Sequence, residues 1–138
     1  MPGPFEYLSI ATIPTSGFEQ KFGSPAPVSD AIISAGPSGN LETIPALLDS
    51  GSSRTIIPHR LAIDLNLRLL NERAKITTAD GNSDYRPMYR ADIRFGGMFF
   101  PNRSVISIVK RHHVLIGRDI LNRVITTLDG PNRHFSIE

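Results

Sequence analysis

The chain has 138 residues, enough for one domain with a sizeable hydrophobic core and too few for a second of typical size. Its 40% apolar and 20% charged residues are typical of a globular protein and exclude disordered, collagen-like and coiled-coil classes. The 15 Lys and Arg residues exceed the 13 Asp and Glu residues by only two, so the charge balance does not indicate nucleic-acid binding. The absence of cysteine excludes disulfides, thiolate metal sites and cysteine nucleophiles.

The N-terminal region differs in composition from the rest, because residues 1–27 hold five of the 11 prolines. We expect these residues to form an arm, with a short strand at 5–13 and a loop at 16–27, ahead of one domain at 28–138. No segment approaches the roughly 20 apolar residues of a membrane span, and no signal peptide is visible. We therefore expect a cytoplasmic protein without a membrane partner.

From residue 28 onward, short apolar runs alternate with turn residues, which predicts strands and few helices. Pro58, together with the shared face of Leu61, Ala62 and Leu65, predicts one short helix. The pattern indicates a compact all-β domain, either a barrel or a sandwich. In chain order, strands are predicted at 28–35, 41–48, 74–79, 88–95, 98–108, 125–128 and 134–137, and helices at 58–67 and 119–124.

The stretch most informative about chemistry is Asp49-Ser50-Gly51-Ser52, which follows the apolar run 46–48. Such a strand would carry Asp49 into a low-dielectric setting, where ionisation is disfavoured unless hydrogen bonds or neighbours compensate. Ser50 offers a hydroxyl group, and Gly51 lacks the Cβ that would crowd the backbone near that carboxylate. Taken alone, the tripeptide is far more typical of a turn acid that caps a strand end than of a catalytic site.

A second element makes the turn interpretation less favourable. The apolar strand 114–116 ends in Gly117-Arg118-Asp119 and then a short helix, 68 positions after Asp49. With both elements, the chain resembles the retropepsin-like aspartic proteases, which are the retroviral proteases and their cellular and bacterial relatives. The resemblance covers residues 28–138, with the turn around Asp80 at the position of the family's flap hairpin.

The resemblance implies a closed β fold of six to seven strands that is active only as a symmetric homodimer on a peptide or protein substrate, with no cofactor. The chain itself contains one Asp-Ser-Gly, whereas aspartic proteolysis uses two carboxylates that share a proton, so a two-fold axis would have to supply the pair. By resemblance, the catalytic acid is Asp49, and its loop contains Ser50, Gly51 and Ser52. The flap and subsite residues are Ala79, Asp80, Gly81, Leu47, His113 and Leu115. The structural second motif is Gly117, Arg118 and Asp119.

The chain departs from the retroviral pattern at two places. Ser53 and Arg54 stand where most retroviral members have acidic residues, so Arg118 lacks the acidic partner expected in its own loop. The flap turn contains Asp80 and Asp84 in place of a glycine-rich tip.

Other interpretations of single residues stay open. Asp119 fits a helix start or an ion pair with Arg118 or Arg123 better than a catalytic role. His112 and His113 are adjacent on a predicted strand and would point to opposite faces, which disfavours a metal site. His113 borders a subsite by resemblance and is otherwise a solvated surface histidine whose charge changes near pH 6.5. Two rival functions remain: a catalytically silent dimeric peptide-binding module on the same fold, and an assembly protein whose Asp-Ser-Gly is only a turn.

Overall fold

The computed structural model describes residues 5–6 and 26–138 and contains ten strands and two short helices. Most of the arm expected at residues 1–27, including the greater part of the strand expected at 5–13, therefore lies outside the described residues. The elements are β1 (Phe5–Glu6), β2 (Val28–Ser34), β3 (Leu41–Leu48), β4 (Ile56–Pro58), α1 (His59–Asp64), β5 (Arg68–Thr77), β6 (Ser83–Phe95), β7 (Met98–Ile108), β8 (Val114–Ile116), α2 (Arg118–Leu121), β9 (Thr126–Asp129) and β10 (His134–Ile137).

Six strands close into a barrel, which confirms the all-β prediction. The strand order is β2-β3-β8-β4-β7-β6, and an additional antiparallel pairing between β2 and β6 closes the ring. Two pairs in this ring are parallel, β3 with β8 and β4 with β7. Closure leaves a single strand of the main sheet, β5, outside the ring.

The barrel interior holds the largest apolar cluster among the described residues. Alternate side chains of β2 and β3 point into it, as expected for strands with one buried face. The helix α1 packs against this cluster through Leu61 and Ala62, which are both almost fully buried. This helix is shorter than the one predicted at 58–67, because Asn66 takes a left-handed φ of 52° and the chain then enters β5.

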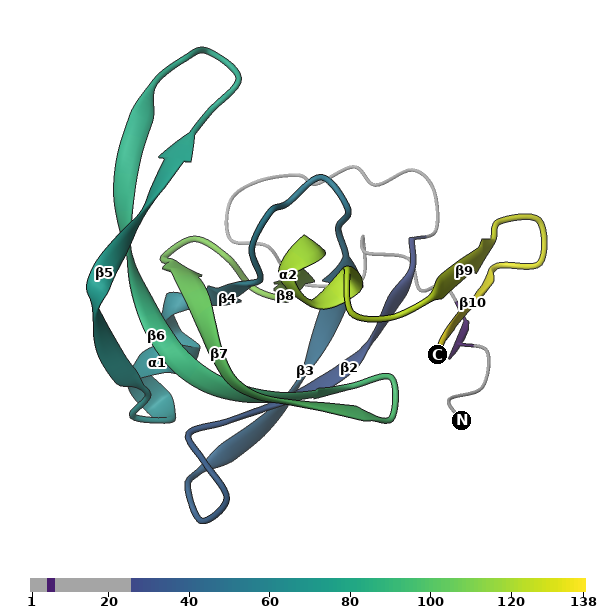
Figure 1. Ribbon diagram of the computed structural model, residues 1–138, viewed down its shortest axis with the longest axis horizontal. Helices are drawn as coiled ribbons and strands as arrows, with labels where there is room; N and C mark the ends of the chain where they lie inside the picture. Colours follow the sequence, from purple (N-terminus) through teal and green to yellow (C-terminus); the bar gives the residue numbers. More distant parts are fainter. Residues whose placement is uncertain (1–4, 7–25) are drawn as a thin grey trace.

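The strands β5 and β6 form a long hairpin that rises beyond the barrel (Figure 1). Its tip falls at residues 78–82, where the sequence predicts a hairpin turn, and Gly81 has a φ of 85°. Both strands are longer than the predicted segments 74–79 and 88–95. The register of the pair shifts between Leu69 and Arg73, so this part of β5 does not alternate cleanly between apolar and polar residues.

A separate three-stranded sheet, in the order β1-β10-β9, lies on the side of the barrel opposite the β5–β6 hairpin (Figure 1). β10 is the central strand, so β9 is an edge strand of this sheet as far as the described residues show. Phe135 and Ile137 of β10 are about 1% exposed and pack into the chain's own core. The apolar face of this terminal strand is therefore covered within the same chain.

Candidate active site

The loop after β3 presents Asp49 at the end of a buried strand. β3 runs parallel to β8, and the amide of Asp49 donates a 2.9 Å hydrogen bond to the carbonyl of Ile116. The Asp49 side chain is half-buried in the single chain. Its Oδ1 accepts a 3.0 Å hydrogen bond from the amide of Gly51. The strand therefore delivers one carboxylate, with one oxygen held by its own loop, to the barrel surface.

Glycine at position 51 fits this close contact between the loop and the carboxylate. A Cβ added there would lie 3.1 Å from Asp49 Oδ1, closer than ordinary van der Waals contact. The next residue, Ser52, closes the loop, because its amide donates to the Asp49 carbonyl over 3.2 Å and its hydroxyl donates to the Arg54 carbonyl over 2.6 Å. The three loop residues named from the sequence thus form one hydrogen-bonded turn around the carboxylate.

The second motif lies directly behind this loop. A Cβ added at Gly117 would lie 2.4 Å from the carbonyl carbon of Arg54, so no larger side chain fits without a backbone shift. The amide of Arg118 donates a 2.8 Å hydrogen bond to the Ser52 carbonyl. The structure therefore brings the two sequence motifs, 68 positions apart, into direct backbone contact.

Thr55 joins the two motifs, and the sequence analysis did not identify it. It is 0% exposed; its hydroxyl donates to Asp119 Oδ1 over 2.8 Å and accepts from the Gly117 amide over 3.2 Å. Its amide donates to Asp119 Oδ2 over 3.1 Å. Asp119 Oδ1 also accepts from the Ile120 amide at the start of α2, as expected for a residue at a helix start. Within the described residues Asp119 makes no ion pair with Arg118 or Arg123, so the ion-pair alternative is wrong.

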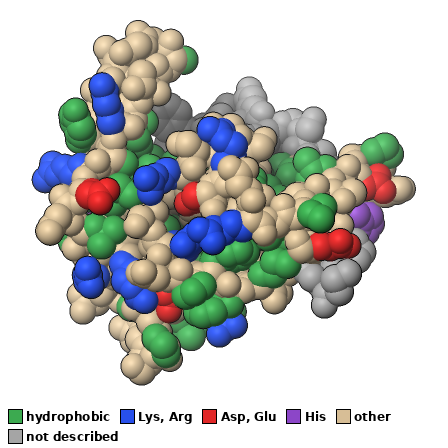
Figure 2. All heavy atoms as spheres, in the orientation of Figure 1, with side chains coloured by type: hydrophobic (Ala, Val, Ile, Leu, Met, Phe, Trp, Pro, Cys, Tyr) green, Lys and Arg blue, Asp and Glu red, His purple; other side chains and the backbone are tan. Residues whose placement is uncertain are grey.

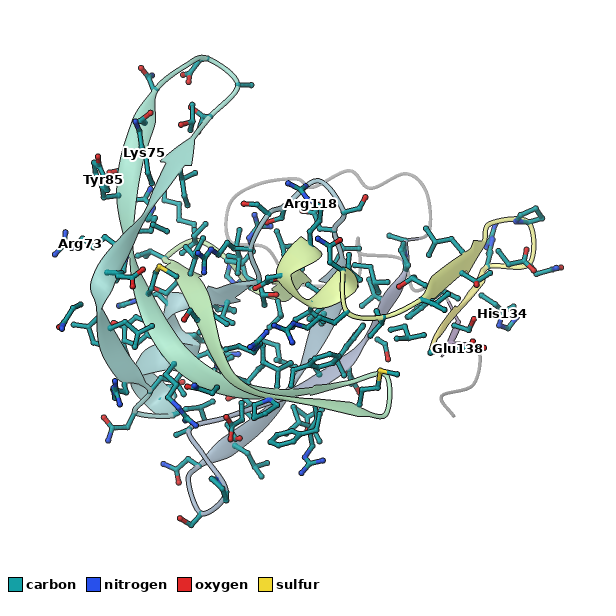
Figure 3. The ribbon with its side chains drawn as sticks, in the orientation of Figure 1. Arg73, Lys75, Tyr85, Arg118, His134 and Glu138 are labelled. Carbon is teal, nitrogen blue, oxygen red and sulfur yellow. The ribbon has the colours of Figure 1, made fainter. Side chains whose placement is uncertain are left out.

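Arg118 extends over the loop that carries Asp49 (Figure 3). Its guanidinium donates a 2.7 Å hydrogen bond to the Ser50 carbonyl. The side chain is exposed and its only hydrogen-bond partner in the described part of the chain is this carbonyl, since Ser53 and Arg54 provide no carboxylate. The Arg118 cation therefore holds the loop that carries Asp49 through a backbone carbonyl.

Ala79, Asp80 and Gly81 lie together at the exposed tip of the β5–β6 hairpin. Asp80 organises this tip: it accepts hydrogen bonds from the Thr78 hydroxyl and from the backbone and side-chain amides of Asn82. The hydrogen bond from Thr78, followed by those from Asn82, lowers the pKa of Asp80. The Asp80 carboxylate thus substitutes for flexible glycines as the group that shapes the turn.

Leu47, Leu115 and His113 lie on the paired strands β3 and β8 or just before β8. Leu47 and Leu115 are directly paired; Leu47 is half-buried and Leu115 is 5% exposed. His113 is 3% exposed, and neither ring nitrogen has a hydrogen-bond partner among the described residues. Burial, then the charge of Arg111 and of His112, lowers the pKa of His113 to about 4. The interpretation of His113 as a solvated surface histidine whose charge changes near pH 6.5 is therefore wrong.

The described residues contain no cluster of three or more His, Cys, Asp or Glu side chains that could hold a metal ion. None of the helices in the described ranges is long and apolar enough to cross a membrane.

Comparison with known proteins agrees with this geometry. A family model described as gag-polyprotein putative aspartyl protease matches residues 38–123. A retropepsin-like aspartic protease from Rickettsia conorii is 15% identical with a TM-score of 0.60, covering 99% of this chain and 91% of its own. The EIAV protease in complex with the inhibitor HBY-793 is 16% identical with a TM-score of 0.53, covering 77% and 91%. No curated protein matches the sequence. The chain belongs to the gag-polyprotein putative aspartyl protease family and has a retropepsin-like fold.

Proposed function

We propose that this protein is an aspartic endopeptidase in which two copies of Asp49, one from each subunit of a homodimer, activate a water molecule. The observation that carries the proposal is the position of Asp49, presented at the end of β3 on a loop that is hydrogen-bonded to the Gly117-Arg118 segment. One carboxylate accepts a proton from the water, and the other donates a proton to the carbonyl oxygen of the substrate. The sequence contains one Asp-Ser-Gly, so each chain provides one of the two carboxylates.

The surface next to the Asp49 loop supports this proposed homodimer. A groove of about 350 Å³ there is lined by Leu48 and Ser50 of the loop, by Leu121 and Val124, and by Leu128 of β9. Edge strands such as β9 present unpaired backbone groups that readily pair with another strand. Because Leu128 is 58% exposed, burying this apolar surface favours association.

The remaining sequence-derived roles follow from this dimer. Ser50 would brace the loop by hydrogen bonding to the partner's loop, and the hairpin tip at Ala79, Asp80 and Gly81 would cover the bound peptide. The terminal strand β10 is paired on both sides within its own chain, with β1 and with β9, so it offers no free edge to a second subunit. We therefore propose that β9 pairs with the second subunit and that β10 holds β9 in place.

The decisive experiment compares the full chain with Asp49→Asn on an unbiased peptide library at several pH values. The substitution keeps the side-chain shape and removes the general base, so cleavage should disappear while the dimer mass persists. Activity of the wild type should peak at acidic to mildly acidic pH, because the pair must share one proton. Retained turnover in Asp49→Asn, or a steady increase of activity to pH 9, would overturn the mechanism. Peptide binding by a dimer without cleavage would instead identify the silent binding module.

A further inference from the structure

The loop between β7 and β8 carries an unusual concentration of positive charge. This loop contains Lys110 and Arg111, followed directly by His112 and His113, and the chain has no Asp or Glu between Asp92 and Asp119. Figure 2 shows Lys and Arg side chains spread over the face on which the catalytic loop lies, with fewer Asp and Glu side chains between them. This charge is local, because the whole chain has a net charge of only +2.

Within this loop, Arg111 differs from the paired arginines of the fold. Arg60, Arg86 and Arg90 each form an ion pair with a carboxylate. The Arg111 side chain is half-buried, yet among residues 5–6 and 26–138 its guanidinium makes no hydrogen bond or ion pair. Partly withdrawing a guanidinium from water without giving its N–H donors a partner is unfavourable, so such a site favours an incoming anion.

Arg111 also lies close enough to Asp49 for the two charges to interact. Burial lowers the pKa of Arg111, and the Asp49 carboxylate acts in the opposite direction as the one acidic group that affects it. The guanidinium stays protonated at any working pH. His113 beside it is neutral above about pH 4, because burial lowers its pKa to about 4. Arg111 is therefore a permanent cation within electrostatic reach of the Asp49 carboxylate.

We propose that Arg111 forms a subsite that selects peptides with an Asp or Glu side chain close to the scissile bond. The inference rests on the proposed endopeptidase function and adds a substrate class to it. A carboxylate there completes the missing ion pair of Arg111, and a planar guanidinium can receive it through two parallel hydrogen bonds. Arg111 is thus a specificity-determining residue.

The test uses the full chain and C-terminally amidated peptides that share one cleavable sequence. Each peptide pair carries Glu or the isosteric Gln at one position near the scissile bond, so that only a side-chain carboxylate differs. The measurement is the Glu-to-Gln ratio of kcat/KM for wild type, Arg111→Gln and the matched control Lys110→Gln, which removes an exposed charge from the same loop. The same peptides are titrated by fluorescence anisotropy against Asp49→Asn and against the double variant Asp49→Asn/Arg111→Gln, which gives a binding readout without cleavage.

We expect the wild type to prefer Glu at one position by about tenfold, equivalent to about 1.4 kcal/mol. The ratio should fall to about one in Arg111→Gln and remain near the wild-type value in Lys110→Gln. A ratio near one in the wild type at every position, or a ratio unchanged in Arg111→Gln, would overturn the inference. If no peptide is cleaved, tighter binding of the Glu peptides that depends on Arg111 would support the subsite and contradict the endopeptidase function. Failure of the subsite and failure of the endopeptidase function therefore give different results.

Discussion

The burial of His113 makes the stability of this protein depend on pH in a specific way. The pKa of His113 falls from 6.5 to about 4, mainly because burial disfavours the imidazolium. The unfolded chain therefore binds this proton more tightly than the folded chain does. The stabilisation is complete above pH 6.5 and is lost as the pH falls toward 4. Applying linkage to these two values, the free energy of unfolding should drop by about 2 kcal/mol between pH 7 and pH 5.

The assay is urea unfolding at pH 7 and pH 5 at one fixed protein concentration, because dimerisation would make stability depend on concentration. His113→Leu replaces the ring with an apolar side chain that takes up no proton. Wild type should therefore lose about 2 kcal/mol more than His113→Leu over this interval. A His134→Gln variant controls for the loss of a histidine from another element. If wild type and His113→Leu lose the same free energy, the argument from burial is refuted.

Three further substitutions test the contacts that hold the site. Gly117→Ala should destabilise the fold by about 3 kcal/mol in urea unfolding because its Cβ meets backbone, whereas Gly130→Ala, with open space around it, should change stability by less than about 0.5 kcal/mol. Thr55→Val should cost about 2 kcal/mol in the same assay because it removes the buried hydroxyl between the motifs, and an unchanged midpoint would contradict that role. Leu128→Glu should weaken the dimer at least about tenfold in sedimentation experiments; equal weakening by Leu41→Glu, on the remote β2–β3 hairpin, would contradict the β9 interface.

The parts of the fold that sequence could predict are those specified by local pattern. The strands at 41–48 and 134–137 have the predicted bounds, because turn residues flank them and their side chains alternate between two environments. β4 was missed, since Ile56–Pro58 is three residues long and gives no periodicity. The first half of β5 was missed because its side chains are mostly exposed and its register with β6 is interrupted.

The same division holds for the candidate site. The Asp49 loop and the Gly117-Arg118-Asp119 segment are both local motifs, so their occurrence together in the sequence pointed to this site. Thr55 could not be identified, because its partner Asp119 is 64 positions away and a lone threonine before an apolar pair carries no signal. The unpaired state of Arg111 was equally hidden, since it depends on which carboxylates the fold brings near.

The hydrogen bonds around Asp49 suggest that each subunit carries its half of the proposed site ready-formed. Ile116 holds the Asp49 amide, the Arg118 amide holds Ser52, and the Arg118 side chain holds Ser50, all within one chain. Ordering a loop during association costs free energy, and a loop already fixed by its own subunit avoids much of that cost. Dimerisation would then have to supply the second carboxylate and bury the groove beside β9, without reorganising the loop that holds the first carboxylate. This explains how a chain of 138 residues can hold one carboxylate in a defined position before its partner is present.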